Sequence, residues 1–525
     1  MPELYKALIV VIVITTTMFL LAKPIFMAHM SAADFVGRRN AWLGVTLAGF
    51  LTPSFWLYVF VASLIILYTA SRDSNPVALY IFLLLAMPPI GEYVPTFGIV
   101  NQLFFLEHLR LMSLLILVPM AFGAFARPSN QALASTLTNT MPKGVRVADM
   151  FMLGYVLLQI ALLMPYEAPT NTLRRVILLG TDIMLPYFVV SRRCRDFAAV
   201  RETMAAFVLA AFVLAPIGVF ESLRGWLMYA GLESHWGIDH FLGFLRRGDT
   251  LRAQTTSGHS IVFGFTLAFA IGFWLYLQTW VAARYQRWVV LLALLAGLVV
   301  TYARGPWLGA AVIWVGMLAL GQHPGKQIVK ASASLLVIVV LGVLSPWGSK
   351  MADNLPFIGS AGQETIDYRA QLAEMSWRLI QQHPWFGSRD FLTYLEDLRQ
   401  GEGIIDMVNA YAGIGLNYGL VGMTLFAGFF LAIIVSAYRW ISRLRSIDAD
   451  LSFAGAALLV CLVSGLIMLG TVNLYLSINY FVWGGAGLLA AYVGAVERLA
   501  GADGARMLQA PAGELAGQAA GTRRW

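Results

Sequence analysis

Several arginines of this 525-residue chain stand where long apolar runs end, at positions where a guanidinium can meet an anion at the edge of a membrane. "TYARGPWLGAAV" carries one charge, Arg304, before a Gly-Pro-Trp turn, and Arg252 precedes the glycine of "LRAQTTSGHS". Arg369 follows in the long segment 347–414. A planar guanidinium makes paired hydrogen bonds to phosphate oxygens. Converging arginines therefore predict a phosphate or pyrophosphate site, most naturally for a lipid-linked group.

The opposing interpretation is that these arginines are only solvated, because large outer segments escape the charge asymmetry of short loops. An arginine near the end of a span can also extend along the lipid to reach water. This interpretation covers part of the set. It suits Arg252 and Arg304 less well, because both lie near span ends beside glycines that let a ligand approach the backbone.

A transfer reaction at such a site could use a carboxylate or an imidazole to take the proton of the attacking hydroxyl. The candidates for this general base are Asp406, His259, Glu221 and Asp367. Each has a structural alternative. The alternatives are helix capping by His259, ion pairing of Glu221 with Arg224 and of Asp406 with Arg399, and a favourable N-terminal helix charge for Asp367.

Three other polar or aromatic residues are candidates for binding the sugar of an acceptor. Asn409 and Tyr411 lie in the loop stretch "DMVNAY", where they could hydrogen-bond a sugar, and Trp377 could stack on one. The alternative is that Asn409 and Tyr411 are ordinary interface residues. Tryptophan at a membrane boundary is also common without any ligand.

The composition excludes most soluble classes of protein. The apolar fraction is 59% and the charged fraction 12%, against roughly 25% charged residues in soluble domains. Cys194 and Cys461 are too few and too far apart for a disulfide framework or a metal site. No phosphate-binding loop or dinucleotide fingerprint is present. We therefore expect an integral membrane protein that uses no metal or other cofactor and binds no nucleic acid.

About fourteen apolar runs are long enough to cross a bilayer as helices, which predicts an all-α, polytopic transmembrane bundle. One of them, 42–70, is interpreted as a single span bent at Pro53. The expected organisation is N-terminal spans (1–202), spans with the arginine motifs (203–346), a partly helical outer loop (347–414), C-terminal spans (415–500) and a disordered tail (501–525).

The short loops rich in arginine set the expected orientation. They are 191–202, 283–287 and 438–445, and they share one side if the N-terminus is cytoplasmic. The segment 127–147 and the C-terminal tail then lie on this side too. The linkers 27–41, 222–259 and 347–414 are expected on the opposite, periplasmic side of a bacterial inner membrane. The spans hold almost no central charge and the two halves show no repeat, which argues against a transporter.

Four stretches, in order, resemble the O-antigen ligase and polysaccharide polymerase family. "TYARGPWLGAAV" resembles its Ser-Arg-Gly-x-x-Leu-Gly motif, with Ala303 in place of the serine. "LRAQTTSGHSIVFGFTLAFAIGF" resembles its Gly-His entry to a span, and "DYRAQLAEMSWRLIQQHPWFGSRDF" its outer-loop helix followed by Pro-x-x-Gly. "DMVNAYAGIGLNYGLVGMTLF" resembles its Asn-x-Tyr motif. The resemblance covers about residues 203–440.

The resemblance implies a membrane glycosyltransferase whose donor is an oligosaccharide on undecaprenyl pyrophosphate. Arg252, Arg304 and Arg369 would then bind the pyrophosphate. Ligases of the family commonly carry a histidine directly before the asparagine, where this chain has Val408. This departure favours an exopolysaccharide or O-antigen polymerase over a ligase that acts on lipid A core. A flippase for the same lipid is the alternative from another class, and a chain-length regulator and export proteins are candidate further partners.

Overall fold

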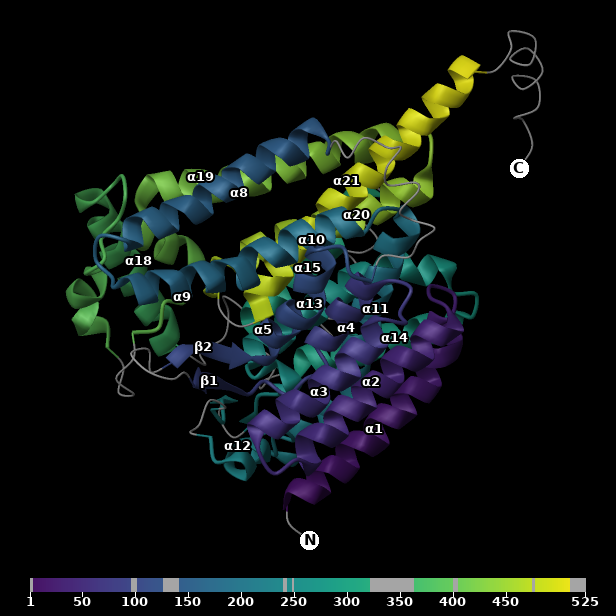
Figure 1. Cartoon of the computed structure of the whole chain (residues 1–525), viewed down its shortest axis with the longest axis horizontal. Coiled ribbons are helices and arrows are strands. Elements are labelled where there is room, and N and C mark those ends of the chain that lie inside the picture. Colours follow the sequence, from purple (N-terminus) through teal and green to yellow (C-terminus); the bar gives the residue numbers. More distant parts are fainter. Residues whose placement is uncertain are drawn as a thin grey trace, which may run out of the picture.

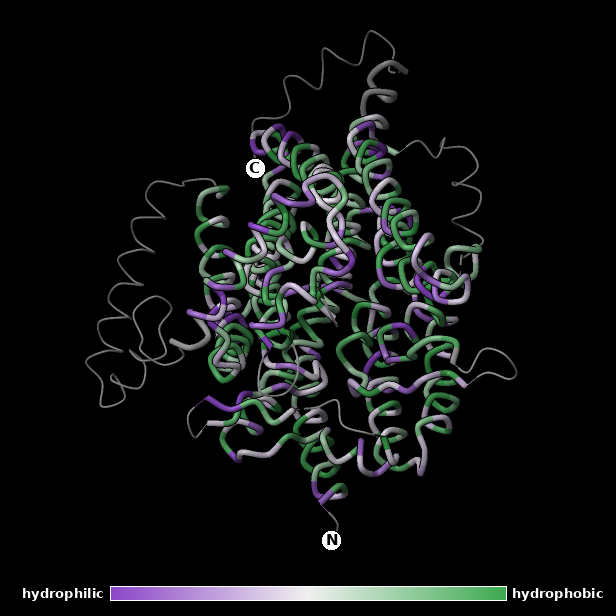
Figure 2. The backbone as a smooth tube through the Cα atoms, turned by 90° about the vertical axis from the view of Figure 1, so that its left-hand side faces the viewer, coloured by the Kyte–Doolittle hydropathy of each residue, from purple (hydrophilic) through white to green (hydrophobic). Residues whose placement is uncertain are grey.

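The computed structural model describes residues 3–95, 102–125, 141–238, 243–247, 250–321, 363–399, 405–474 and 477–509. It confirms the all-α, polytopic bundle (Figure 1). Within these residues, seven helices are long and apolar enough to cross a membrane. They are α1 (Glu3–Phe26), α8 (Lys143–Leu163), α11 (Phe197–Arg224), α13 (Ser260–Leu277), α19 (Ala410–Leu444), α20 (Ala449–Met468) and α21 (Ser477–Gln509). Figure 2 shows how hydrophobic residues predominate along the helices of the bundle.

The remaining described helices are shorter or less apolar. They are α2 (Ala32–Leu51), α3 (Phe55–Ala70), α4 (Pro76–Leu84), α5 (His108–Met112), α6 (Val118–Ala121), α9 (Pro169–Leu179), α10 (Leu185–Arg193), α12 (Gly231–Trp236), α14 (Arg284–Val299), α15 (Arg304–Leu320) and α18 (Gln363–Gln382). Wider π-turns, η1 (Ser113–Leu117) and η2 (Gly180–Met184), join α5 to α6 and α9 to α10. The 3₁₀ turns are η3 (Thr255–Ser257), η4 (Gln278–Trp280) and η5 (Phe391–Leu398).

Two small hairpins interrupt the helices, and the sequence patterns did not predict them. β1 (Gly91–Pro95) pairs antiparallel with β2 (Gln102–Glu107), with Gly91 opposite Glu107. β3 (Arg246–Arg247) pairs with β4 (Thr250–Leu251). At the centre of the bundle, α11 and α13 pack against each other and are almost wholly buried. The helices α1, α8 and α19 leave most of their apolar surface exposed, as expected of helices that face lipid.

The apolar run 42–70 is two antiparallel helices, so its interpretation as one bent span is wrong. Thr52 ends α2, with its backbone N–H bonded to the Ala48 carbonyl, and the Ser54 hydroxyl caps α3. The helices α2 and α3 then pack together along their length. Pro53 and the serine cap reverse the chain here, and the apolar run does not reveal this reversal because only three residues, Thr52 to Ser54, separate the two helices.

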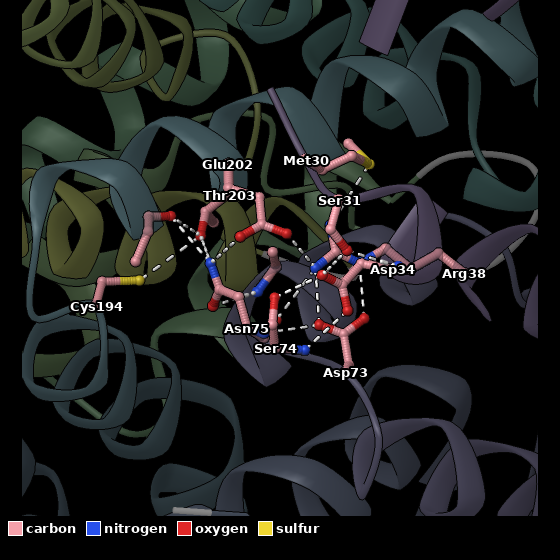
Figure 3. A network of polar contacts seen from close by, with 12 residues as sticks. Met30, Ser31, Asp34, Arg38, Asp73, Ser74, Asn75, Cys194, Glu202 and Thr203 are labelled. Atoms are coloured by element: carbon pink, nitrogen blue, oxygen red, sulfur yellow. Dashed lines mark hydrogen bonds and ion pairs between the residues drawn. The ribbon is translucent and has the colours of Figure 1, made fainter. Parts of the chain in front are cut away.

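A buried polar network ties the far ends of this hairpin to α11 (Figure 3). The guanidinium of Arg38 in α2 makes two hydrogen bonds of 2.8 Å to Asp73, just beyond α3. It also bonds to Glu202 in α11 at 2.6 Å. Asn75 donates to the same Glu202 carboxylate. Breaking such a buried pair from one side costs several kcal/mol, roughly 3–5. The network therefore fixes this end of the bundle, where the arginine-rich loop 191–202 lies.

The extra reversal places the N-terminus at the opposite end of the bundle from the loop 191–202. Leu4, in the first turn of α1, lies against Gly231 of α12, which follows the far end of α11. The ring nitrogens of His235 and Trp236 are each 3.0 Å from the Thr52 carbonyl at the same end. The prediction that the N-terminus shares a side with 191–202 is therefore wrong, and so is the placement of 27–41 on the outer side.

The C-terminal end of α21 lies where it was predicted, beside the arginine-rich loop. The Arg498 guanidinium donates to the Arg195 carbonyl at 2.5 Å. The helix continues to Gln509, so the predicted disorder does not begin at 501. Residues 510–525, the predicted span 328–346 and the start of the outer loop lie outside the described residues.

The outer loop docks onto a break in α19, at the left of Figure 1. Gly419 interrupts the helix with a φ of +61°, and a Cβ there would lie 2.4 Å from the Trp385 backbone. The Leu420 N–H donates to the Pro384 carbonyl at 2.7 Å, and the Val421 N–H to the Trp385 carbonyl at 3.2 Å. The "HPWFG" and "NYGLVG" stretches are thus two halves of one contact, which anchors the C-terminal end of α18 to α19.

Candidate functional site

A strained turn between α14 and α15 forms the base of the arginine-rich site. Tyr302 has a φ of +48°, a conformation that is costly for a residue with a side chain. The turn directs two carbonyl groups at arginines of the preceding outer segment. Arg252 Nε donates to the Thr301 carbonyl at 3.1 Å, and Arg247 Nη1 donates to the Tyr302 carbonyl at 3.0 Å. Two of the arginines are therefore held beside the first residue of α15, Arg304.

Glu221 holds the segment that carries Arg252 and His259. Its carboxylate is 1% exposed and accepts the backbone N–H groups of Met228 and Gln254 at 3.0 Å and of Thr255 at 2.8 Å. The sequence suggested a base or a partner of Arg224 for this residue. Three backbone donors occupy the carboxylate instead. Glu221 thus positions the loop, and its catalytic role stays an untested prediction.

Arg369 reaches the same site from α18. Its Nη2 donates to the Thr471 carbonyl at 3.3 Å, and the Thr471 side chain lies against Gly305, the second residue of α15. The Nε of Arg369 is buried and has no hydrogen-bond partner among the described residues. A buried donor of this kind can serve a ligand.

The guanidinium groups are close enough to repel each other. Burial lowers the pKa of Arg247, and the charges of Arg304 and Arg369 lower it further. Burial also lowers the pKa of Arg369, with the Arg304 charge acting in the same direction and Asp406 opposing both. An anion bound here would relieve this repulsion. Arg247, which the sequence motifs did not single out, therefore belongs to the site.

Asp406 is the carboxylate of this arginine cluster, which we define as Arg247, Arg252, Arg304 and Arg369. Burial raises the pKa of Asp406, and the Arg369 charge opposes that rise. Its backbone carbonyl accepts the Tyr368 hydroxyl at 2.9 Å. Arg399, the ion-pair partner suggested by the sequence, is paired with Glu396 at 2.6 Å. The arginine that acts on Asp406 is thus Arg369.

His259 takes the capping position at the start of α13. Its Nδ1 accepts the Ile261 backbone N–H at 3.2 Å. Burial, together with the Arg252 charge, lowers the pKa of His259 to about 4. The imidazole is therefore neutral near pH 7. The capping alternative is seen directly in the structure, and catalysis by His259 stays a prediction.

The three predicted sugar-binding residues have different surroundings. The Asn409 side chain caps α19 by accepting the N–H groups of Tyr411 and Ala412 at 2.9 and 3.2 Å. The Tyr411 hydroxyl donates to the Leu466 carbonyl at 2.6 Å. Both residues therefore shape the segment that follows Asp406. Trp377 is 61% exposed on α18, and its stacking on a sugar stays a prediction.

A polar cavity of about 590 Å³ lies next to this segment, and sequence reasoning missed it. Its walls carry Glu107, Arg110, Arg175 and Asp182. The signal was present in the sequence, because Asp182 stands inside the predicted span 173–191. The prediction that the spans hold almost no central charge is therefore wrong for the span 173–191. In the described part of the chain, no group of three His, Cys, Asp or Glu side chains is arranged to hold a metal.

The apolar helices and the outer arginine cluster define a polytopic membrane protein with a charged site at one end of its bundle. Residues 289–427 match the family model described as O-antigen ligase. This match, over about a quarter of the chain, supports an O-antigen ligase/Wzy-type family and confirms the resemblance. The match includes Arg304, Arg369 and Asp406 and implies ligase- or polymerase-type function. No curated protein matches the chain.

Proposed function

We propose that this protein is a polysaccharide polymerase that joins oligosaccharide repeat units carried on undecaprenyl pyrophosphate. The observation that supports it most is the convergence of four arginines from three separate segments around one turn, beside the carboxylate of Asp406. A pyrophosphate is the group that such a cluster suits best, because its oxygens can accept several paired hydrogen bonds. The donor then lies with its lipid among the helices and its sugar toward the outer loop.

In this reaction an acceptor hydroxyl oxygen attacks the anomeric carbon of the donor sugar. The bond from that carbon to the pyrophosphate oxygen breaks, and undecaprenyl pyrophosphate leaves with the bonding electrons. The arginine cluster stabilises the charge that develops on this leaving group. The Asp406 carboxylate takes the proton of the acceptor hydroxyl. Partial burial raises the pKa of Asp406, which makes the carboxylate a better proton acceptor than an aspartate with the ordinary pKa, while the residue stays accessible to an acceptor.

The α15 N-terminus adds to the stabilisation of the leaving group. The family motif has a serine where this chain has Ala303, and Ala303 offers no side-chain cap. The first backbone N–H groups of α15 are therefore not occupied by a capping side chain and carry the positive end of the helix dipole. Together with Arg304, they form a site suited to a phosphate oxygen.

Polymerase is favoured over ligase because Val408 stands where ligases commonly carry a histidine, next to Asn409, which caps α19. Proton transfer then falls to Asp406. The ligase alternative keeps the same donor and uses lipid A core as acceptor.

In either case we expect the outer loop in the periplasm and the loop 191–202 in the cytoplasm. Impermeant thiol labelling of single cysteines in a Cys194→Ser, Cys461→Ser background tests this; labelling at 191–202 in intact spheroplasts would contradict it.

Turnover by the purified protein tests the proposed function. The protein in lipid nanodiscs is incubated with a defined undecaprenyl-pyrophosphate-linked oligosaccharide, and the products are separated by size. A ladder of multiples supports a polymerase. Single addition to lipid A core, supplied in a parallel reaction, would support the ligase instead. A separate reconstitution into proteoliposomes tests for transport. Movement of the lipid-linked oligosaccharide across the membrane without glycosidic bond formation would favour a flippase.

A further inference from the structure

The cavity next to the arginine cluster lies between α8, α9, η2, α19 and α21. Its volume of about 590 Å³ falls in the range of ligand pockets, roughly 300–1,000 Å³. Aromatic rings such as Tyr155 and Trp483 line it together with amides such as Asn417 and Asn473. Mixed aromatic and amide walls suit sugars, which combine apolar ring faces with hydroxyl groups.

One wall of the cavity has its charges balanced. Arg110 donates to both oxygens of Asp182, with the shortest distance 2.8 Å, and lies 3.5 Å from Glu107. The Tyr480 hydroxyl donates to Asp182 at 2.6 Å. Burial raises the pKa of Glu107 to about 7, so near neutral pH this carboxyl is partly protonated. The cation at this wall is thus already satisfied by protein groups.

About two turns before Asp182, on the same helical segment of the lining, Arg175 is a cation that the protein does not balance. Arg175 Nη2 donates to the Gln159 amide oxygen at 3.1 Å and to the Tyr418 hydroxyl at 3.3 Å, and both of these partners are neutral. In the described residues, no carboxylate lies within 4.0 Å of Arg175. The Gln159 side chain is buried, and its amide nitrogen has no hydrogen-bond partner there. The wall therefore offers hydrogen-bond donors and positive charge together.

We propose that this cavity binds an anionic sugar of the acceptor glycan, with Arg175 and Gln159 donating to its carboxylate or phosphate group. A guanidinium in a partly buried wall makes shorter and stronger hydrogen bonds to an oxyanion than to a sugar hydroxyl, and the neutral Gln159 amide adds a further donor. The same wall would therefore discriminate between charged and neutral repeat units. The proposal rests on the proposed function, in which the chain transfers glycans.

The position of the cavity fits an acceptor site. Met407 and Ala410 line it, whereas Asp406, at the start of the same segment, lies beside Arg369 of the arginine cluster. A glycan held in the cavity could therefore extend a hydroxyl past this short segment to the base. The segment itself is fixed by the Ala410 N–H, which bonds to the carbonyls of Leu469 and Val472 at 3.0 and 3.1 Å.

Direct binding of small sugars tests this proposal without any turnover. The full-length protein in nanodiscs is titrated with three probes by ligand-observed NMR: a glucuronic-acid-containing disaccharide, its neutral glucose analogue and glucose 6-phosphate. We expect at least one anionic probe to bind about tenfold more tightly than the neutral one, a difference of about 1.4 kcal/mol. Which anion binds more tightly identifies the carboxylate or the phosphate as the source. Equal binding of all three, or no binding, would overturn the proposal.

Variants at adjacent positions supply the controls. Arg175→Gln should abolish the preference for the anion, and Arg175→Lys should keep part of it because the charge remains. Arg174→Gln is the matched control, because Arg174 donates to the Leu103 carbonyl and does not line the cavity. A preference that survives Arg175→Gln overturns the proposal. If turnover fails while the Arg175-dependent preference holds, the proposed function is wrong and the anion site stands. If turnover occurs without that preference, the proposed function stands and the anion site is wrong.

Discussion

The Glu221 carboxylate accepts the Thr255 backbone N–H at 2.8 Å and thereby joins the end of α11 to the loop that carries Arg252 and His259. The same carboxylate also accepts the Gln254 backbone N–H at 3.0 Å, and the two hydrogen bonds together fix the direction of the loop. The position of Arg252 beside the turn before α15 therefore depends on a residue that does not itself face the arginine cluster.

Glu221→Gln should destabilise the protein and lower turnover together. The amide replaces one acceptor oxygen with a donor, which then faces backbone N–H groups, at a cost of roughly 1–3 kcal/mol. Thermal unfolding in detergent and turnover measure the two effects. Arg224→Gln, which changes the exposed partner suggested by the sequence, should alter neither. A Glu221→Gln protein as stable as wild type but inactive would instead identify Glu221 as a catalytic group.

The pH dependence of stability tests the environment of His259. The pKa of His259 is lowered to about 4 in the folded protein, against an ordinary value of 6.5. Between these values the unfolded chain binds the proton more readily, so stability should fall as the pH falls from about 6.5 to about 4. His259→Asn keeps a capping oxygen and removes the titration.

We therefore expect His259→Asn to lose less stability than wild type between pH 7 and pH 5. Its thermal unfolding at the two pH values gives the comparison. Turnover of this variant at pH 7 should remain substantial, because the imidazole acts as a cap. Complete loss of turnover in a variant of normal stability would show that His259 is the base.

Asp406→Asn should abolish glycosyl transfer and leave donor binding intact, because the amide keeps the shape of the side chain and cannot take the proton. Asp397→Asn, a change at an exposed aspartate of the outer loop, is the control and should be silent. A structural role predicts a different outcome. Lower stability with partial activity, restored in part by also neutralising Arg369, would mean that Asp406 only balances that arginine.

The fold class could be predicted because a helix that faces lipid must be apolar over its whole length, which leaves a clear pattern in the sequence. The reversal at Pro53 could not, because the turn consists only of Thr52, Pro53 and Ser54, which is too short an interruption to distinguish two helices from one bent span. The N-terminus was consequently placed on the wrong side. Composition fixes the existence of spans, whereas the number of reversals depends on single caps such as Ser54.

The candidate site could be predicted only in part. Arg304 and Asp406 stand in local motifs, so their types and order identify them. Arg247, Arg175 and Gln159 do not, because their roles arise from contacts between distant segments. Arg175, for example, meets Tyr418 across 243 residues. Spacing along a chain cannot report such proximity.

Gly419→Ala should strongly destabilise the contact between the outer loop and α19. A Cβ at this position would lie 2.4 Å from the Trp385 backbone, and the φ of +61° is unfavourable for alanine. We expect a loss of about 2 kcal/mol or more and faster proteolysis of the outer loop. Gly413→Ala, in the same helix with only ordinary contacts, is the control. Unchanged protease resistance in Gly419→Ala would contradict the docking of "HPWFG" on α19.

The central claim is that the arginine cluster binds the donor pyrophosphate, and Arg304→Lys tests it most directly. Lysine keeps the charge and loses the planar fork, so turnover of the lipid-linked oligosaccharide by the purified variant should fall about tenfold or more at normal stability. Arg378→Lys, at an exposed arginine paired with Glu374 on α18, should be unchanged. Wild-type turnover and donor affinity in a folded Arg304→Lys protein, and again in Arg304→Ala, would contradict the account.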